Sequence, residues 1–162
     1  KYTADASLAG ARLKAEQARL ADKHGKYVPL AVKIGADIDA AQIQSLADLL
    51  RAQRIDGAIA TATTQSRDGV AGLPNAGEAG GLSGAPLLAQ STLVLRSLAS
   101  ALAGEVTIIG VGGIVCGADA QAKIDAGASL VQLYSGLVYR GPELIAEAAA
   151  ALAQAKKAQS VR

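Results

Sequence analysis

Two short apolar segments, each followed at once by a turn that contains glycine, lie between residues 106 and 143 and constrain the fold most. The first, 107–111, is rich in β-branched residues and ends at Gly112 and Gly113. The second spans 130–134. Both have the length and composition of buried strands. The stretch between them has helical spacing, so the three segments form a βαβ unit with parallel strands.

The turns of this unit predict an anion site. The second strand stops at Ser135 and Gly136, and Gly141-Pro142-Glu143 then opens a helix, with proline suited to its first turn. Consecutive turns with free backbone N–H groups, beside a helix N-terminus, predict binding of a dianionic phosphate. Ordinary tight turns explain the first glycine pair equally well, and the second turn favours phosphate.

The rest of the chain repeats this alternation of helices and strands. Asp39 or Asp37 is expected to cap the second helix, and Ser91 the third. Residues 65–90 contain six glycines and predict a functional loop over one end of the sheet. Helices are expected at 5–23, 40–53, 92–102, 117–126 and 142–157, and strands at 27–34, 55–61, 107–111 and 130–134.

Continuous apolar strands joined by helical crossovers imply a parallel sheet of an α/β protein. Four βα units preceded by one helix are half of a (β/α)₈ TIM barrel, which takes about 250 residues when complete. Residues 1–162 are therefore predicted to form a single partial domain, a half-barrel. Its open interior face and unpaired strand edges predict self-association or a complementary half, and a monodisperse monomer in light scattering would count against this.

Composition excludes several classes of function. With a net charge of +2, four Tyr and no Phe or Trp, the chain has no stacking platform for nucleic acid. No apolar run approaches the roughly 20 residues of a membrane span. One cysteine excludes an internal disulfide, and one histidine with dispersed carboxylates offers no metal site. A chain without Met does not begin at a start codon, so a fragment, a processed chain or an edited sequence is expected.

Six segments resemble the C-terminal half of class 2 (quinone-dependent) dihydroorotate dehydrogenases, in the family's order and spacing. The glycine-rich loop and the YSG…YRGP ending are specific to that family, whereas GVGGI alone is shared with other phosphate-binding barrels, which remain an alternative. The segments are VPLAVKI (28–34), IDGAIAT (55–61), GLPNAGEAGGLSG (72–84), STLVLRSLA (91–99), IIGVGGI (108–114) and AGASLVQLYSGLVYRGPELI (126–145).

The resemblance implies a flavoprotein oxidoreductase of pyrimidine biosynthesis. In this family a base removes a proton from dihydroorotate while hydride passes to FMN, giving orotate, and quinone then reoxidises the flavin. The base is a serine of the family's N-terminal half, so no catalytic residue is assigned here and the isolated chain is expected to be inactive. The full-length family lies at the cytoplasmic side of the membrane through N-terminal helices, and no membrane segment is expected in this chain.

By the resemblance, Lys33 would contact the pyrimidine edge of the flavin, where its charge stabilises the anionic reduced ring. A lysine in an apolar strand needs a partner or an escape to solvent, so snorkelling from the strand end is the alternative. Thr61 would hydrogen-bond the flavin or its ribityl chain. The alternative for Thr61, Thr63 and Thr64 is that their hydroxyls simply satisfy polar groups at the end of the strand, and for Thr64 we prefer that interpretation.

The remaining cofactor contacts implied by the resemblance are backbone contacts. Gly84 and Gly113, with Gly112 beside it, would let FMN approach the backbone closely. Tyr134 and Ser135 would offer backbone N–H groups to the FMN phosphate.

Departures from the family pattern surround the implied substrate site, where Ala62 and Thr63 lie. Ala62 stands where the family has the asparagine that holds orotate, and each unpaired polar group of a buried substrate costs about 1–3 kcal/mol. Ala36 and Ala85 replace a usual proline and arginine. A non-catalytic half-barrel, engineered or degenerate, that binds FMN or only phosphate is therefore the second hypothesis.

Three polar residues outside these motifs are interpreted as structural. Cys116 follows a strand but has no evident histidine partner, which favours a small buried thiol over a nucleophile. His24 is expected to be exposed at a helix C-terminus, where it interacts with the dipole. Glu78 is expected to be a solvated carboxylate of the glycine-rich loop.

Overall fold

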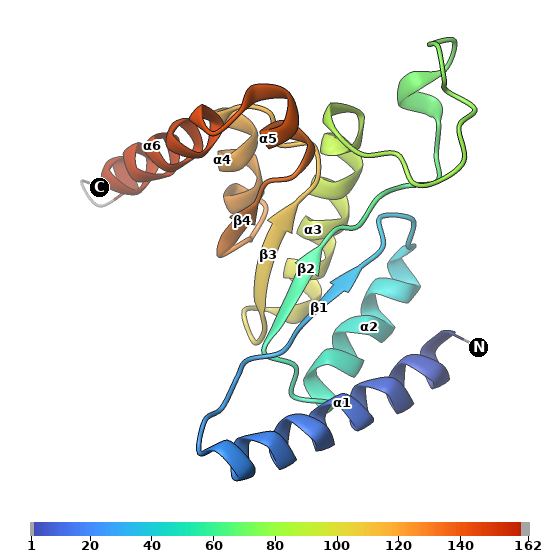
Figure 1. The fold of residues 1–162 in the computed structure, drawn as a ribbon, viewed down its shortest axis with the longest axis vertical. Helices are drawn as coiled ribbons and strands as arrows, with labels where there is room; N and C mark the ends of the chain where they lie inside the picture. Colours follow the sequence, from blue (N-terminus) through green and yellow to red (C-terminus); the bar gives the residue numbers. More distant parts are fainter. Residues whose placement is uncertain (1, 160–162) are drawn as a thin grey trace.

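Four parallel strands form one sheet in chain order in the computed structural model, which describes residues 2–159 (Figure 1). The register aligns Val32 with Ala58 and Ala58 with Ile108, and it aligns Gly110 with Val131. The predicted parallel sheet is confirmed, and three of its four strands, the first, second and fourth, are shorter than expected. The strands are β1 (Ala31–Ile34), β2 (Gly57–Ala60), β3 (Thr107–Val111) and β4 (Leu130–Gln132).

All five expected helices are present. The described residues also contain one helix that was not expected, which lies between β4 and the last helix. In this part of the chain no helix is both long and apolar enough to cross a bilayer. The helices are α1 (Tyr2–His24), α2 (Ala40–Ala52), α3 (Leu88–Leu102), α4 (Gly117–Asp125), the unexpected α5 (Ser135–Arg140) and α6 (Glu143–Gln159), with 3₁₀ turns η1 (Asp68–Val70) and η2 (Ala85–Leu87).

One face of the sheet is buried and the other is open. Successive side chains of a strand point to opposite faces, so Ile34 and Ile108 pack with α2 and α3 while Lys33 and Thr107 are exposed on the opposite face. Leu98 of α3 is fully buried in this core. The helix cover on one side of the strands is therefore as expected for a half-barrel.

A side-chain cap explains where α2 begins, whereas α3 begins without one. Asp39 caps α2, because its carboxylate accepts from the Gln42 N–H at 2.8 Å and Gln42 returns the contact to the Asp39 N–H. The expected cap of α3 at Ser91 is wrong, since η2 leads directly into α3 at Leu88. Ser91 lies inside the helix and is buried.

Asp56 ties α1 and the segment that follows it to the start of β2. Its carboxylate accepts from the Leu30 N–H at 2.7 Å and from the Tyr27 hydroxyl, and it lies 3.7 Å from the Lys14 ammonium. The Leu30 N–H, above all, lowers the pKa of Asp56 to about 2, and the Tyr27 hydroxyl adds to this effect. The ionised carboxylate is therefore the form that holds α1 in place.

Asp56→Asn is expected to lower the free energy of unfolding by about 1 kcal/mol at neutral pH, a value reduced for solvent screening. The folded pKa of about 2 lies below the unfolded value, so this stabilisation is present above about pH 4 and is lost as the pH falls towards 2. Urea unfolding between pH 7 and pH 2 measures it. The exposed Asp22→Asn serves as control, and a gap between Asp56→Asn and wild type that stayed constant with pH would contradict the assignment.

Candidate functional site

A cavity of about 390 Å³ lies where the carboxyl ends of all four strands meet. Because these ends share one edge of a parallel sheet, residues that follow different strands are brought together there. The residues that line it are Lys33 of β1; Thr61, Ala62 and Thr63 after β2; Val111, Gly112, Gly113 and Ile114 at the end of β3; Gln132, Tyr134, Ser135 and Gly136 at the end of β4; and Gly81, Ser83 and Leu87 of the long loop.

The segment after β2 is held by its two neighbouring strands. The Thr61 N–H donates to the Val111 carbonyl at 3.1 Å, and the Ala62 N–H donates to the Ile34 carbonyl at 2.6 Å. Thr61 is 2% exposed, and its hydroxyl donates to the Ala62 carbonyl at 2.8 Å. The Ala60–Thr61 peptide bond is cis. Ala62 also lines the cavity, and its methyl side chain can form no hydrogen bond.

The next threonine anchors the base of the long loop. The Thr64 hydroxyl and the Gln65 N–H both donate to Asp37, and Gln90 of α3 donates to the same carboxylate at 2.8 Å. The Thr64 hydroxyl, first, and the Gln65 N–H lower the pKa of Asp37. Asp37 is therefore not a helix cap. Thr64 has the structural role that was preferred for it from the sequence, since its hydroxyl binds Asp37 at the base of the loop.

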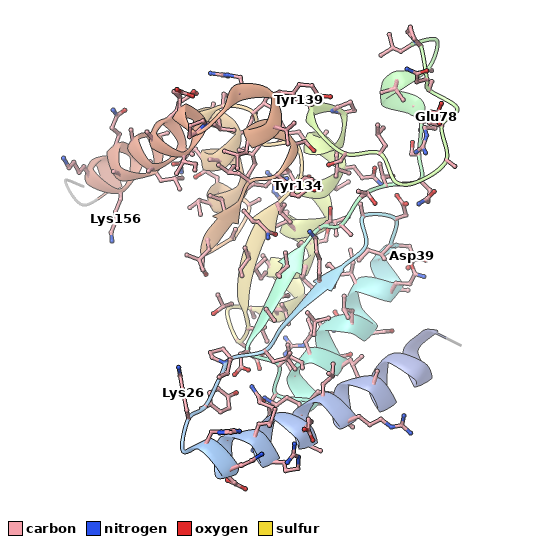
Figure 2. All side chains as sticks on the ribbon, in the orientation of Figure 1. Lys26, Asp39, Glu78, Tyr134, Tyr139 and Lys156 are labelled. Carbon is pink, nitrogen blue, oxygen red and sulfur yellow. The ribbon has the colours of Figure 1, made fainter. Side chains whose placement is uncertain are left out.

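The long loop lines the cavity with its returning arm, while its tip projects beyond the sheet (Figure 1). Thr64 pairs with Leu82, and the Arg67 guanidinium donates to the carbonyls of Glu78 at 3.0 Å and Gly80 at 2.5 Å. Glu78 is exposed on this tip, as expected (Figure 2). Only the base of the loop therefore lies over the end of the sheet, as expected. The loop is also shorter than predicted, because α3 begins at Leu88.

The glycine corner, defined as Gly112 and Gly113, is pressed against the first turn of α3. Gly112 has a φ of +107° and Gly113 a φ of +80°, in the region that favours glycine. A Cβ at Gly113 would lie 2.4 Å from the Leu88 Cα, and one at Gly112 would lie 2.8 Å from the Ser91 Oγ. The corner is therefore glycine for internal packing as well as for any ligand on its open side.

The second corner, defined as Tyr134, Ser135 and Gly136, touches the first. A Cβ at Gly136 would lie 2.0 Å from the Ile114 carbonyl oxygen, directly after the glycine corner. Ser135 shares a 2.8 Å hydrogen bond with Ser83 of the loop. The two corners that the sequence identified separately therefore meet in one cavity.

Lys33 stands at the other side of this cavity, on the open face of β1. It forms no ion pair within the described part of the chain, so its ammonium is available to a bound group. Lys33 is the one cationic residue among the described residues that line the cavity, and these include no Asp, Glu or His. The electrostatics of the cavity thus favour an anionic ligand.

Not every sequence-predicted residue lines the cavity, and some lining residues were missed. Gly84 is not among the lining residues and stands beside them, since its Cβ would lie 3.7 Å from the Ser135 Cβ. Gln132 and Ser83 were missed, although Gln132 follows β-strand alternation onto the open face that carries Lys33.

Cys116 and His24 lie outside the cavity lining. Cys116 is half-buried at the start of α4, where its N–H donates to the Asp119 carboxylate at 3.1 Å, so the expectation of a buried thiol is correct only in part. His24 is exposed at the end of α1, as predicted. Within residues 2–159, no three His, Cys, Asp or Glu side chains gather as a metal site would require.

The fold resembles that of a solved dihydroorotate dehydrogenase. The crystal structure of DHODH in complex with ferulenol from Eimeria tenella superposes with a TM-score of 0.78 at 35% sequence identity. The match covers 84% of this chain and 36% of that one. The four strands therefore correspond to part of a (β/α)₈ barrel.

Sequence comparisons agree with this likeness. The dihydroorotate dehydrogenase (quinone) of Cupriavidus pinatubonensis is 62% identical over 140 residues, which are 86% of this chain and 41% of that protein. That of Chromobacterium violaceum is 61% identical over 150 residues, or 93% of this chain and 44% of that protein. The chain thus spans about two fifths of the length of these relatives. The family model for dihydroorotate dehydrogenase matches residues 3–155, and the chain belongs to that family.

Proposed function

We propose that this chain is the C-terminal, FMN-binding half of a dihydroorotate dehydrogenase, whose complete barrel oxidises dihydroorotate to orotate and passes electrons to quinone. The observation that carries the proposal is the convergence of four strand ends on one cavity. Lys33 lies at one side of it, and the glycine corner and the second corner meet within it.

The cavity fits a phosphorylated flavin by several physical criteria. Its volume of about 390 Å³ lies within the range of small-molecule sites. The backbone N–H groups of Gly113 and Tyr134 form no hydrogen bond within the described part of the chain, which leaves them for phosphate oxygens. No lining carboxylate opposes a dianion there. Backbone donors without side chains in front of them are what a phosphate cradle requires.

Each side of the cavity has a distinct task in this proposal. The two corners would hold the phosphate and so orient the rest of the cofactor. Lys33 would place its positive charge beside the flavin ring, where negative charge develops during hydride transfer. FMN, when bound, supplies the hydride acceptor. Thr61 is fixed by its hydrogen bond to the Ala62 carbonyl and would present its hydroxyl oxygen as an acceptor.

Proton removal from the substrate is assigned to the rest of the barrel. The lining residues described here include no carboxylate or imidazole, the usual general bases. Ser83 and Ser135 hydrogen-bond to one another at 2.8 Å and have no basic partner in the lining. The chain by itself is therefore expected to bind flavin without oxidising dihydroorotate.

Titration of the purified chain with FMN, followed by quenching of flavin fluorescence, tests the proposal. We expect saturable quenching, and about tenfold weaker binding of riboflavin, which lacks the phosphate, because charge-assisted hydrogen bonds contribute about 1.5–3 kcal/mol. Absence of quenching by either flavin would overturn the proposal. Equal affinity for both flavins would remove the phosphate role from the two corners.

A second candidate function is flavin or phosphate binding without catalysis, and Ala62 favours it. Its methyl group lines the cavity where the family resemblance places an asparagine amide that holds orotate. The FMN-loaded chain can be combined with an N-terminal half from a close relative and assayed for dye reduction by dihydroorotate. Turnover would support the enzyme, whereas bound flavin without turnover would support the binding protein.

A further inference from the structure

Lys123 of α4 is a fully buried lysine that the proposed function does not use. Its side chain is 0% exposed, and its ammonium donates to the hydroxyls of Ser91 at 2.6 Å and Thr92 at 2.8 Å. The Leu88 carbonyl lies 3.5 Å away. All of these partners are neutral, and within the described residues Lys123 forms no ion pair. A buried charge without an ion-pair partner is costly, so its retention requires a reason.

The hydrogen bonds of Lys123 lead to the glycine corner through Ser91. The Ser91 hydroxyl has one proton and two acceptors within reach, the carbonyls of Leu88 at 3.1 Å and Gly112 at 3.0 Å. The Leu88 carbonyl already accepts from the Thr92 hydroxyl at 2.7 Å and lies beside the ammonium. The Gly112 carbonyl has no other donor among the described residues and is the nearer acceptor, so the proton of Ser91 is assigned to it.

This hydrogen bond sets the direction of the next N–H group. The peptide bond between Gly112 and Gly113 is not among the cis bonds, so its carbonyl and its N–H point in opposite directions. With the Gly112 carbonyl held towards Ser91 of α3, the Gly113 N–H is directed away from α3. Since Gly113 lines the cavity, that direction is the one that a phosphate in the cavity needs.

We propose that Lys123 is a positioning residue of the phosphate site: through Ser91 it orients the glycine corner, and its buried charge is balanced by the bound phosphate. The inference rests on the proposed function, because FMN is the ligand whose phosphate would be held.

A purely structural role explains the site less well. Joining α3 to α4 needs only an apolar side chain, which would fill the same volume without desolvating a charge. Burial lowers the pKa of Lys123 to about 8, and Asp119 on the same helix opposes this shift without reversing it. Lys123 therefore carries its charge at an unfavourable position, directly behind the glycine corner, which is one of the two corners where an anion is expected.

Lys123→Met tests the inference, because methionine keeps the length of the side chain and removes its charge. We expect FMN to bind about tenfold more weakly, riboflavin affinity to change less than about twofold, and the ³¹P resonance of bound FMN to shift. Lys26→Met is the matched control, since it removes an exposed lysine in the segment between α1 and β1, at the far end of the sheet from α4 (Figures 1 and 2). It is expected to leave both affinities and the ³¹P resonance unchanged.

Ser91→Ala provides a second test that leaves the lysine in place. It removes the hydroxyl that links Lys123 to the Gly112 carbonyl and is expected to weaken FMN in the same selective way. If Lys123→Met fails to fold, this variant decides the question. Equal losses for FMN and riboflavin, or no loss for either, would overturn the inference while the proposed function stood. Wild-type protein that binds neither flavin, or both equally, would instead refute the phosphate site and this inference with it.

Discussion

Gly113→Ala is expected to lower the free energy of unfolding by about 2–5 kcal/mol and to abolish FMN binding. The added Cβ would lie 2.4 Å from the Leu88 Cα and 2.5 Å from its backbone N, so no side-chain rotation relieves the contact. Overpacking of this kind costs about 1–3 kcal/mol or more, and a residue with a Cβ at a φ of +80° adds about 1–2 kcal/mol. Urea unfolding followed by circular dichroism measures the first effect, and flavin fluorescence the second.

Gly35→Ala is the matched control for this prediction. Gly35 lies directly after β1, its φ is outside the positive region, and an added Cβ would meet nothing within 4 Å. Its effect on stability is expected to stay within about 0.5 kcal/mol. Similar losses for both variants would show that the glycine corner is not packed against α3 as described.

Lys33→Met is expected to make the midpoint potential of the bound flavin more negative by on the order of 50 mV. Removing one pre-organised charge beside a developing anion costs about 2–3 kcal/mol, and 30 mV corresponds to about 1.4 kcal/mol for a two-electron couple. Methionine retains most of the side-chain volume, so the fold is expected to be unaffected. Equilibration with a reference dye during reduction by dithionite measures the potential of the loaded chain.

The same measurement on Lys26→Met controls for net charge, since Lys26 is exposed and does not line the cavity. An unchanged potential is expected for that variant. If Lys33→Met left the potential unchanged while FMN stayed bound, Lys33 would be the snorkelling strand-end lysine of the alternative interpretation.

Much of the fold could be predicted because the strands are apolar and the crossovers are amphipathic. The segments around Ala58 and Ile108 are too continuous in their hydrophobicity for exposed loops, and parallel strands follow from the helices between them. The meeting of Lys33, Thr61 and Gly113 then follows from topology alone, because all three stand at carboxyl ends of neighbouring strands. That these residues bind FMN stays a prediction until the titration is done.

The features that sequence reasoning missed are those without a periodic signal. Helix α5 has six residues, too few to show an apolar stripe, and it begins at a serine and a glycine that are typical of a turn. Ser91 was expected at a helix start because serine favours caps, whereas its hydroxyl is used for a tertiary contact inside α3. Lys123, in a helix with charged neighbours, looks like a surface residue until the packing of α3 is known.

The order β1-β2-β3-β4 has a consequence for how the chain is built during synthesis. Each strand pairs with the one made just before it, so every new strand finds its partner already in place. Folding can therefore proceed from the N-terminal units towards the C-terminal ones while the ribosome is still at work. The cavity needs the segment after β4, so it is completed only once all four strands are in place, and a ligand can add its binding energy only from that point on.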